Sequence, residues 1–316
     1  MSGDAVAPLR VGTNANNAMT TGPLEERRTL LERVRATGID HVFTADHVSF
    51  HTGIGMDGLI QAATLAASVP DLAVHIGVYL LALRHPVPVA RQIAQIAESA
   101  PGRLHLGIGV GGEDRHEVEI CGVDPKTRGR RTSASLEALR GLLSGEPTTH
   151  DDAFFSFEDA KIVPAPNPPV PIVIGGRVDA AVRRAALLGD GWLGVWCSPR
   201  RFGAVTQEIG AIASAERKWP VPTAWDHGLQ VWVGIDEDRT AARERLAREM
   251  QAFYRIPFDP FEKYSPSGSA EEVADFLAGY AEAGCRHFNV MPIAPTIEAG
   301  IEGVAEIRDR LRTHFA

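Results

Sequence analysis

Short apolar runs alternate along the whole chain with longer segments whose apolar residues recur every three or four positions. The short runs have the length of buried β-strands, and the longer segments have the period of amphipathic α-helices. Each run is followed by one such segment, which gives eight strand–helix units. The predicted strands are 9–13, 39–44, 73–81, 104–110, 171–174, 192–196, 229–235 and 286–291.

The helix boundaries carry their own signals. Pro23 opens a first helix that Gly38 ends, Asp57 is positioned as an N-cap, and Ser269 with Glu272 has the spacing of a capping box. Further helices are expected around Val89–Ala100 and over 132–143 and 179–188, after Pro199, from Asp238, and from Ile297 onward.

Eight strand–helix units predict an α/β fold of the (β/α)8 TIM-barrel type, for which about 250 residues suffice. An open, doubly wound sheet is the alternative fold. We interpret residues 1–316 as one domain with two insertions. Residues 145–169 are predicted to form a loop with a short hairpin, and residues 250–268 an irregular lid rich in aromatic residues.

The composition argues against several classes of protein. The formal net charge of −8 argues against a general nucleic-acid binder, which presents a basic face. Cys121, Cys197 and Cys285 have neither zinc-site nor disulfide spacing. No apolar run approaches the ~18 residues of a membrane span, and no signal-peptide pattern opens the chain. We therefore expect a cytoplasmic protein with no metal, no membrane and no nucleic-acid partner.

Three predicted strands end in residues suited to chemistry. Residues 39–44 lead into Asp46 and His47, and residues 104–110 lead into Gly111, Gly112 and Glu113. Active sites of parallel barrels lie at the carboxyl ends of the strands, and histidine transfers protons near neutral pH. A hydrogen-bonded structural histidine and a sharp strand–helix turn are the alternative interpretations.

The last of these three strands, residues 171–174, ends in Gly175, Gly176 and Arg177 ahead of a helix. Ser198 and Arg200 open the next helix. Backbone N–H groups at a helix N-terminus bind phosphate. Two ordinary helix N-termini with surface arginines are the alternative.

Several chemistries lack their motifs. There is no His-x-His after the first strand and no Gly-x-Ser-x-Gly elbow, which argues against a metal amidohydrolase and a serine hydrolase. The glycines of 107–112 do not have the dinucleotide-binding spacing. With four lysines in the chain, and none on a predicted inner strand, a Schiff-base aldolase is disfavoured.

The chain resembles the bacterial-luciferase-like superfamily of flavin- and deazaflavin-dependent oxidoreductases over nearly its whole length. The resemblance rests on the order and spacing of a set of motifs. These are residues 38–47 (GIDHVFTADH), Gly77-Val78, 84–91 (RHPVPVAR), 101–112 (PGRLHLGIGVGG), 169–176 (PVPIVIGG) and 189–192 (GDGW).

This resemblance implies a (β/α)8 barrel holding coenzyme F420 or FMN in its mouth. It places the cofactor phosphate on Gly175, Gly176 and the start of the Ser198 helix. It also implies a non-proline cis peptide bond behind the ring, which alignment assigns to Tyr79–Leu80. The cofactor-binding residues expected from it are Asp46, Val78, Tyr79, Leu80, Gly109, Gly111, Gly112, Gly175, Gly176, Arg177, Trp196, Ser198 and Arg200.

Within the superfamily, the chain is more similar to the deazaflavin branch, because Val110-Gly111-Gly112 stands where the FMN branch tends to carry an arginine. The resemblance implies hydride transfer, with His47 and Glu113 handling protons and Asp46 orienting His47 or contacting the ring. Phe50 and His51 replace the tryptophan of the sugar-phosphate branch, so a small, mostly apolar substrate is expected. The pocket wall is expected from Phe50, Tyr79, Trp196 and Trp232.

Two other functions remain open. One is an FMN-dependent monooxygenase supplied by a separate reductase, and the other is a flavin-binding barrel without turnover. A homodimer is the quaternary structure that the superfamily implies.

Overall fold

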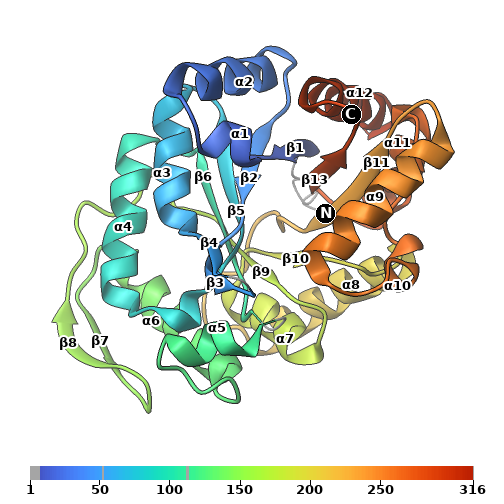
Figure 1. Ribbon diagram of the computed structural model, residues 1–316. Coiled ribbons are helices and arrows are strands. Elements are labelled where there is room, and N and C mark those ends of the chain that lie inside the picture. The colour runs from blue at the N-terminus through green and yellow to red at the C-terminus, as the bar shows by residue number, and fades with distance from the viewer. Residues whose placement is uncertain (1–7, 52, 112–113, 316) are drawn as a thin grey trace. The chain divides into compact units, whose positions relative to one another are not determined.

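The computed structural model describes residues 8–51, 53–111 and 114–315, and within them all eight predicted strands are present (Figure 1). The chain has the predicted (β/α)8 barrel fold. The strands in chain order are β1 Arg10–Asn14, β2 His41–Thr44, β5 Ala73–Tyr79, β6 Leu104–Ile108, β9 Ile172–Gly175, β10 Gly191–Gly194, β11 Gly228–Ile235 and β13 His287–Ile293.

The predicted helices are also present. The nine long helices among the described residues are α2 Leu24–Ala36, α3 Gly58–Ser68, α4 Pro86–Ser99, α6 Arg128–Leu142, α7 Asp179–Leu188, α8 Pro199–Glu216, α9 Arg239–Tyr254, α11 Ala270–Glu282 and α12 Ile297–Phe315. Asp57 caps α3 through the N–H groups of Leu59 and Ile60, and the Ser269–Glu272 capping box closes at the start of α11. Among the described residues, no helix has the length and apolar character needed to cross a bilayer.

The chain divides into two compact units. The first unit contains residues 8–43, 191–211 and 222–315. Its strands pair in parallel in the order β2-β1-β13-β11-β10, with the short strand β12 (Ser267–Gly268) beside β11. Because the strands are parallel, the loops that follow β1 and β13 leave the same edge of this sheet.

The second unit contains the described residues of 44–190 together with 212–221. Its strands pair in parallel in the order β5-β6-β9. Several short elements were not predicted, among them the hairpin of β3 (His47–Phe50) and β4 (Ile54–Met56) and the short helix α5 (Arg115–Ile120).

The first insertion forms the predicted hairpin, of β7 (Thr148–Asp151) and β8 (Ser156–Ala160). The prediction for 250–268 was wrong in part, because these residues begin inside α9 and include the short helix α10 (Asp259–Glu262). The helical spacing of the buried residues Ala242, Leu246 and Met250 carries α9 past the predicted boundary. The helix stops at Arg255, whose φ is 57°.

Candidate active site

A histidine and a buried glutamate meet just after β2. Nδ1 of His47 lies 3.0 Å from Oε2 of Glu117, which comes from α5. The Glu117 side chain is 3% exposed, and that of His47 is 18% exposed. A carboxylate only accepts hydrogen bonds, so Nδ1 carries the hydrogen of this bond and Nε2 is left for proton exchange. Sequence reasoning missed Glu117.

The same α5 turn anchors the β3–β4 hairpin that carries His47. The Glu117 carboxylate accepts the N–H groups of Val48 and Ser49, at 2.7 and 3.1 Å. Asp114, the N-cap of α5, accepts the N–H of His51 at 2.7 Å. The bond from His51, with those that Asp114 accepts from the N–H groups of His116 and Glu117, lowers the pKa of Asp114. The Phe50 ring lies 4.2 Å from that of His47, so the imidazole is held on two sides.

Asp46 is bonded to residues other than the expected ones. Its carboxylate accepts the N–H groups of Gly58 and Leu80, at 2.9 and 2.8 Å, and forms a bidentate pair with Arg84. Burial raises the pKa of Asp46, and the Arg84 charge and the two backbone bonds oppose that rise. The carboxylate at Nδ1 of His47 thus belongs to Glu117, whereas Asp46 fixes the backbone that follows β5.

Glycines surround the end of β5. A Cβ atom at Gly109 would lie 2.3 Å from Cγ2 of Val78, and one at Gly175 would lie 2.8 Å from its Cγ1. The half-buried Val78 side chain therefore occupies space that these glycines leave. The cis peptide bond joins Gly77 and Val78, so the assignment to Tyr79–Leu80 was wrong by two residues. The β5–β6 register is irregular between Ile76 and Tyr79, and alignment by regular strand spacing misses such a shift.

Tyr79 and Leu80, which follow Val78, are both buried. Tyr79 is 1% exposed and has the Arg84 guanidinium 4.4 Å from its ring centre, so it is a core residue and not the expected pocket wall. Leu80 is also buried, and its N–H is bound by Asp46. Gly111 has a φ of 66°. Gly112 and Glu113 lie outside the described residues, so their predicted roles stay predictions.

The predicted phosphate residues occur at two helix starts, one in each unit. Gly175 ends β9, and Gly176 and Arg177 lead to α7, whose N-cap is the apolar Val178. Val178 has no side-chain cap bond, which suits an external anion. At the start of α8 the Ser198 hydroxyl accepts the N–H of Arg201 at 3.2 Å, so it caps that helix, and Arg200 lies in its first turn.

Trp196 belongs to an aromatic cluster in the first unit. Its ring lies 4.6 Å from Phe261 and 5.0 Å from Tyr254, and its φ is 48°. Tyr254 accepts the indole N–H of Trp232 at 3.1 Å. Tyr254 of the predicted lid thus packs on both expected wall tryptophans, and it belongs with Phe258 and Phe261 to a core cluster of this unit.

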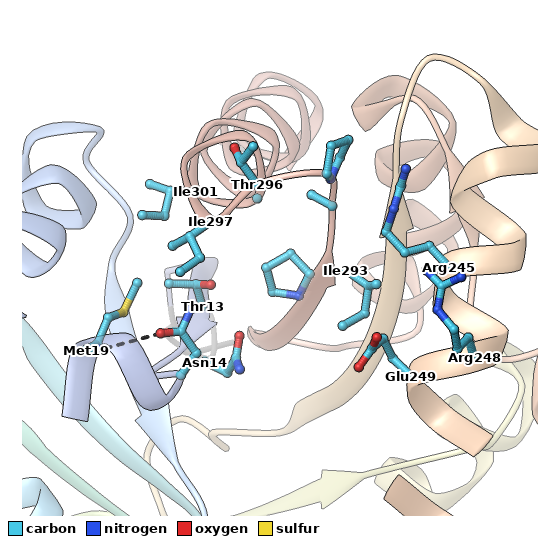
Figure 2. A pocket seen from close by; sticks show the side chains of 15 residues that line it. Thr13, Asn14, Met19, Arg245, Arg248, Glu249, Ile293, Thr296, Ile297 and Ile301 are labelled. Carbon is cyan, nitrogen blue, oxygen red and sulfur yellow. Dashed lines mark hydrogen bonds between the residues drawn. The ribbon is translucent and has the colours of Figure 1, made fainter. Parts of the chain in front are cut away.

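A pocket of about 520 Å³ lies beyond the carboxyl ends of β1 and β13 (Figure 2). Met19, Ile297 and Ile301 form one side of it. Arg245, Arg248 and Glu249 of α9 face them, and Arg245 is paired with Asp236 at 3.2 Å. In the described part of the chain, no group of three or more His, Cys, Asp and Glu residues could hold a metal ion.

The chain is similar in sequence and in fold to several known proteins. An uncharacterized protein of Mycobacterium tuberculosis is 34% identical over 138 residues, so the match spans about half of each chain, 44% of this one and 47% of the relative. The F420-dependent glucose-6-phosphate dehydrogenase of Beutenbergia cavernae is 33% identical over 214 residues, which cover 66% of this chain and 63% of the relative.

The fold has a solved counterpart in an F420-dependent secondary alcohol dehydrogenase, with a TM-score of 0.81 and 20% identity. That similarity covers 96% of this chain and 99% of the solved one. Residues 8–265 match the family described as luciferase-like monooxygenase. The chain therefore belongs to the luciferase-like monooxygenase family.

Proposed function

We propose that this protein is an oxidoreductase that uses the deazaflavin coenzyme F420 to move a hydride to or from a small organic substrate. The observation that carries the proposal is the His47–Glu117 pair after β2, in which a buried carboxylate orients a partly exposed imidazole. Two proteins similar to this chain, the Beutenbergia cavernae relative and the solved alcohol dehydrogenase, are described as F420-dependent dehydrogenases, which supports the cofactor.

His47 has the proton-transfer role in this proposal. Hydride transfer between a carbonyl and an alcohol also moves a proton to or from the substrate oxygen. With Nδ1 engaged by Glu117, Nε2 of His47 gives or takes that proton. Glu113, which we expected as a second acid/base, keeps that role in the proposal.

The residues around β5, β6 and β9 fit a flat, phosphate-bearing cofactor. Gly109 and Gly175 have no side chains beside Val78, so these three residues form an apolar surface on which a planar ring can lie. We call this surface the cofactor floor. Gly175, Gly176 and Arg177 before α7 suit the phosphate. A deazaflavin bound there supplies the carbon that gives or accepts the hydride. In the proposal, Asp46 and Arg84 hold the backbone at Leu80 and so keep this floor in place.

We propose that the pocket of Figure 2, within the first unit, binds a small organic molecule. β1 pairs in parallel with β2 on one side and with β13 on the other, and barrel enzymes bind small molecules at the carboxyl ends of their strands. Its apolar side, formed by Met19, Ile297 and Ile301, suits the body of an apolar molecule. Arg248 and Glu249 on the other side suit a polar group at one end of that molecule.

A binding titration of the cofactor-free protein with F420 and with FMN tests the proposal. We expect F420 to quench tryptophan fluorescence with the tighter dissociation constant, and reduced F420 to be consumed with a carbonyl from a substrate panel. No F420 binding at concentrations that saturate an authentic F420 enzyme would overturn the proposal.

The second candidate is an FMN-dependent monooxygenase supplied by a separate reductase. The match of residues 8–265 to a family described as luciferase-like monooxygenase favours it. Oxygen consumption with chemically reduced FMN, together with tighter binding of FMN than of F420, would establish this function instead.

We further propose that the protein works as a cytoplasmic homodimer. Sedimentation at several protein concentrations tests the dimer. Fractionation of the producing cells tests the location.

A further inference from the structure

A basic pocket of about 450 Å³ lies between α6 and α7 of the second unit (helices labelled in Figure 1). Four cationic side chains line it, against the single carboxylate of Glu137. The cations are Lys126, Arg130, Arg183 and Arg184. This local excess of positive charge contrasts with the formal net charge of the whole chain, which is −8. A lining of this kind attracts anions.

Arg184 is the most unusual of the four. It is 8% exposed, and its guanidinium donates to the Ser133 hydroxyl at 3.0 Å and to the Gly129 carbonyl at 2.8 Å. Within the described residues no carboxylate pairs with it, and burial lowers its pKa. A buried charge without a counter-ion is costly, so an anion in the pocket would offset part of that cost.

The other cations leave most of the charge uncompensated. Arg183 pairs with Glu216 at 2.9 Å. Lys126 and Arg130 are exposed and form no ion pair in the part of the chain that the structure describes. Three cations therefore face the pocket with only Glu137 as an opposing charge.

A second pocket of about 560 Å³ adjoins the first and shares Glu137, Arg183, Leu187 and Leu188 with it. It adds Lys218, the half-buried Trp219, and Glu216, whose carboxylate is paired with Arg183. Arginine and lysine bind phosphate oxygens, and an indole face beside leucines binds a flat organic group. The two pockets together form a groove with an anion-binding part and an apolar aromatic part.

We infer that this groove, on the outer helices of the second unit, binds a phosphorylated small molecule of the nucleotide type. Its phosphate groups contact Lys126, Arg130 and Arg184, and its ring lies against Trp219. The inference is independent of the proposed redox function, because none of the residues that line the groove is assigned to hydride transfer or to the redox cofactor.

Calorimetry with pyrophosphate and with ADP tests this site. We expect both probes to bind, and Lys126→Gln and Arg130→Gln each to weaken binding about tenfold. Arg239→Gln removes an exposed arginine of the other unit and should leave binding unchanged, which makes it the matched control. Arg184→Met tests the buried charge, and if that variant does not fold, Lys126→Gln and Arg130→Gln still decide.

Trp219→Phe separates the two parts of the groove. It should abolish the fluorescence change on ADP addition while leaving pyrophosphate affinity within twofold of the original protein. Binding of pyrophosphate alone would restrict the site to free phosphates and overturn the nucleotide assignment. Absence of binding by both probes, or affinities that Lys126→Gln and Arg130→Gln leave unchanged, would overturn the site.

Discussion

Glu117 holds Nδ1 of His47 at 3.0 Å while its carboxylate also bonds the backbone of the hairpin that carries this histidine. One buried side chain therefore sets both the tautomer of the imidazole and the position of its loop. This coupling makes Glu117 a positioning residue, with effects distinct from those of removing the imidazole itself.

Glu117→Gln should lower turnover by about 10–100-fold. A glutamine amide can donate to Nδ1 and reverse the tautomer, so Nε2 would begin the reaction with the wrong protonation. Cofactor affinity should not change, whereas the pH profile of turnover and the ¹⁵N shifts of His47 should. Glu119→Gln, an exposed neighbour in α5, is the matched control. Turnover and ¹⁵N shifts equal to those of the original protein would contradict the positioning role.

His47→Ala should reduce turnover by about 10²–10⁴-fold and leave the dissociation constant for F420 nearly intact. The imidazole moves a proton in the proposed reaction, and no bond from it to the cofactor is required. Stopped-flow absorbance of F420 measures the step, and His116→Ala on the exposed side of α5 is the control. If His47→Ala turns over at the original rate, another group carries the proton.

Asp46→Asn should destabilise the fold by about 1–3 kcal/mol, because Arg84 loses its bidentate carboxylate and keeps only its pair with Asp57. Glu302→Gln breaks a pair with Arg33 that is exposed on both sides and should change stability by less than about 1 kcal/mol. Chemical unfolding monitored by circular dichroism compares the two. Equal losses of unfolding free energy in the two variants would show that the Asp46–Arg84 pair stabilises the end of β5 no more than an exposed ion pair would.

Buried His227 should make stability fall in mild acid. Burial lowers its pKa to about 4 from 6.5, and its Nδ1 accepts the N–H of Trp192 at 3.2 Å, which requires a neutral ring. Between these two values the unfolded chain binds a proton that the folded protein does not, so stability decreases as the pH falls. The loss attributable to His227 between about pH 7.5 and about pH 5 is about 2 kcal/mol.

His227→Asn keeps an acceptor for Trp192 and removes the titrating ring. Its unfolding free energy should therefore depend less steeply on pH over that interval than that of the original protein. Identical slopes for the two proteins in urea titrations would assign the acid sensitivity to other groups.

The strands could be predicted because each contains a run of consecutive buried residues, such as Ile172–Gly175, whose burial needs no knowledge of its neighbours. The partner of His47 could not. Glu117 and Glu119 lie in one short helix, one buried and one exposed, and nothing in their spacing distinguishes them. The Asp114-x-x-Glu117 pattern signals a helix start, but it does not show that the Glu117 side chain turns to another loop.

Asp46 illustrates the same limit. Its position after a buried strand predicted a functional carboxylate, yet its bonds to Leu80 and Arg84 depend on the path of the chain after β5. The position of the cis bond depends likewise on a local irregularity between β5 and β6. The sequence shows which polar residues follow each strand. Which side chains from different loops then pair is determined by the three-dimensional fold.

Gly109→Ala should lower both stability and F420 affinity. The new Cβ would lie 2.3 Å from Cγ2 of Val78, so one of the two strands must shift, which costs about 1–3 kcal/mol. Gly210→Ala places the same methyl group on α8 with no atom within 4 Å, and should be neutral or slightly stabilising. The double variant Gly109→Ala with Val78→Ala removes the clash and should recover stability, but the changed floor should keep F420 affinity low. Recovery of neither property would place the cause outside the Gly109–Val78 contact, and full recovery of affinity would show that Val78 is not part of the cofactor floor.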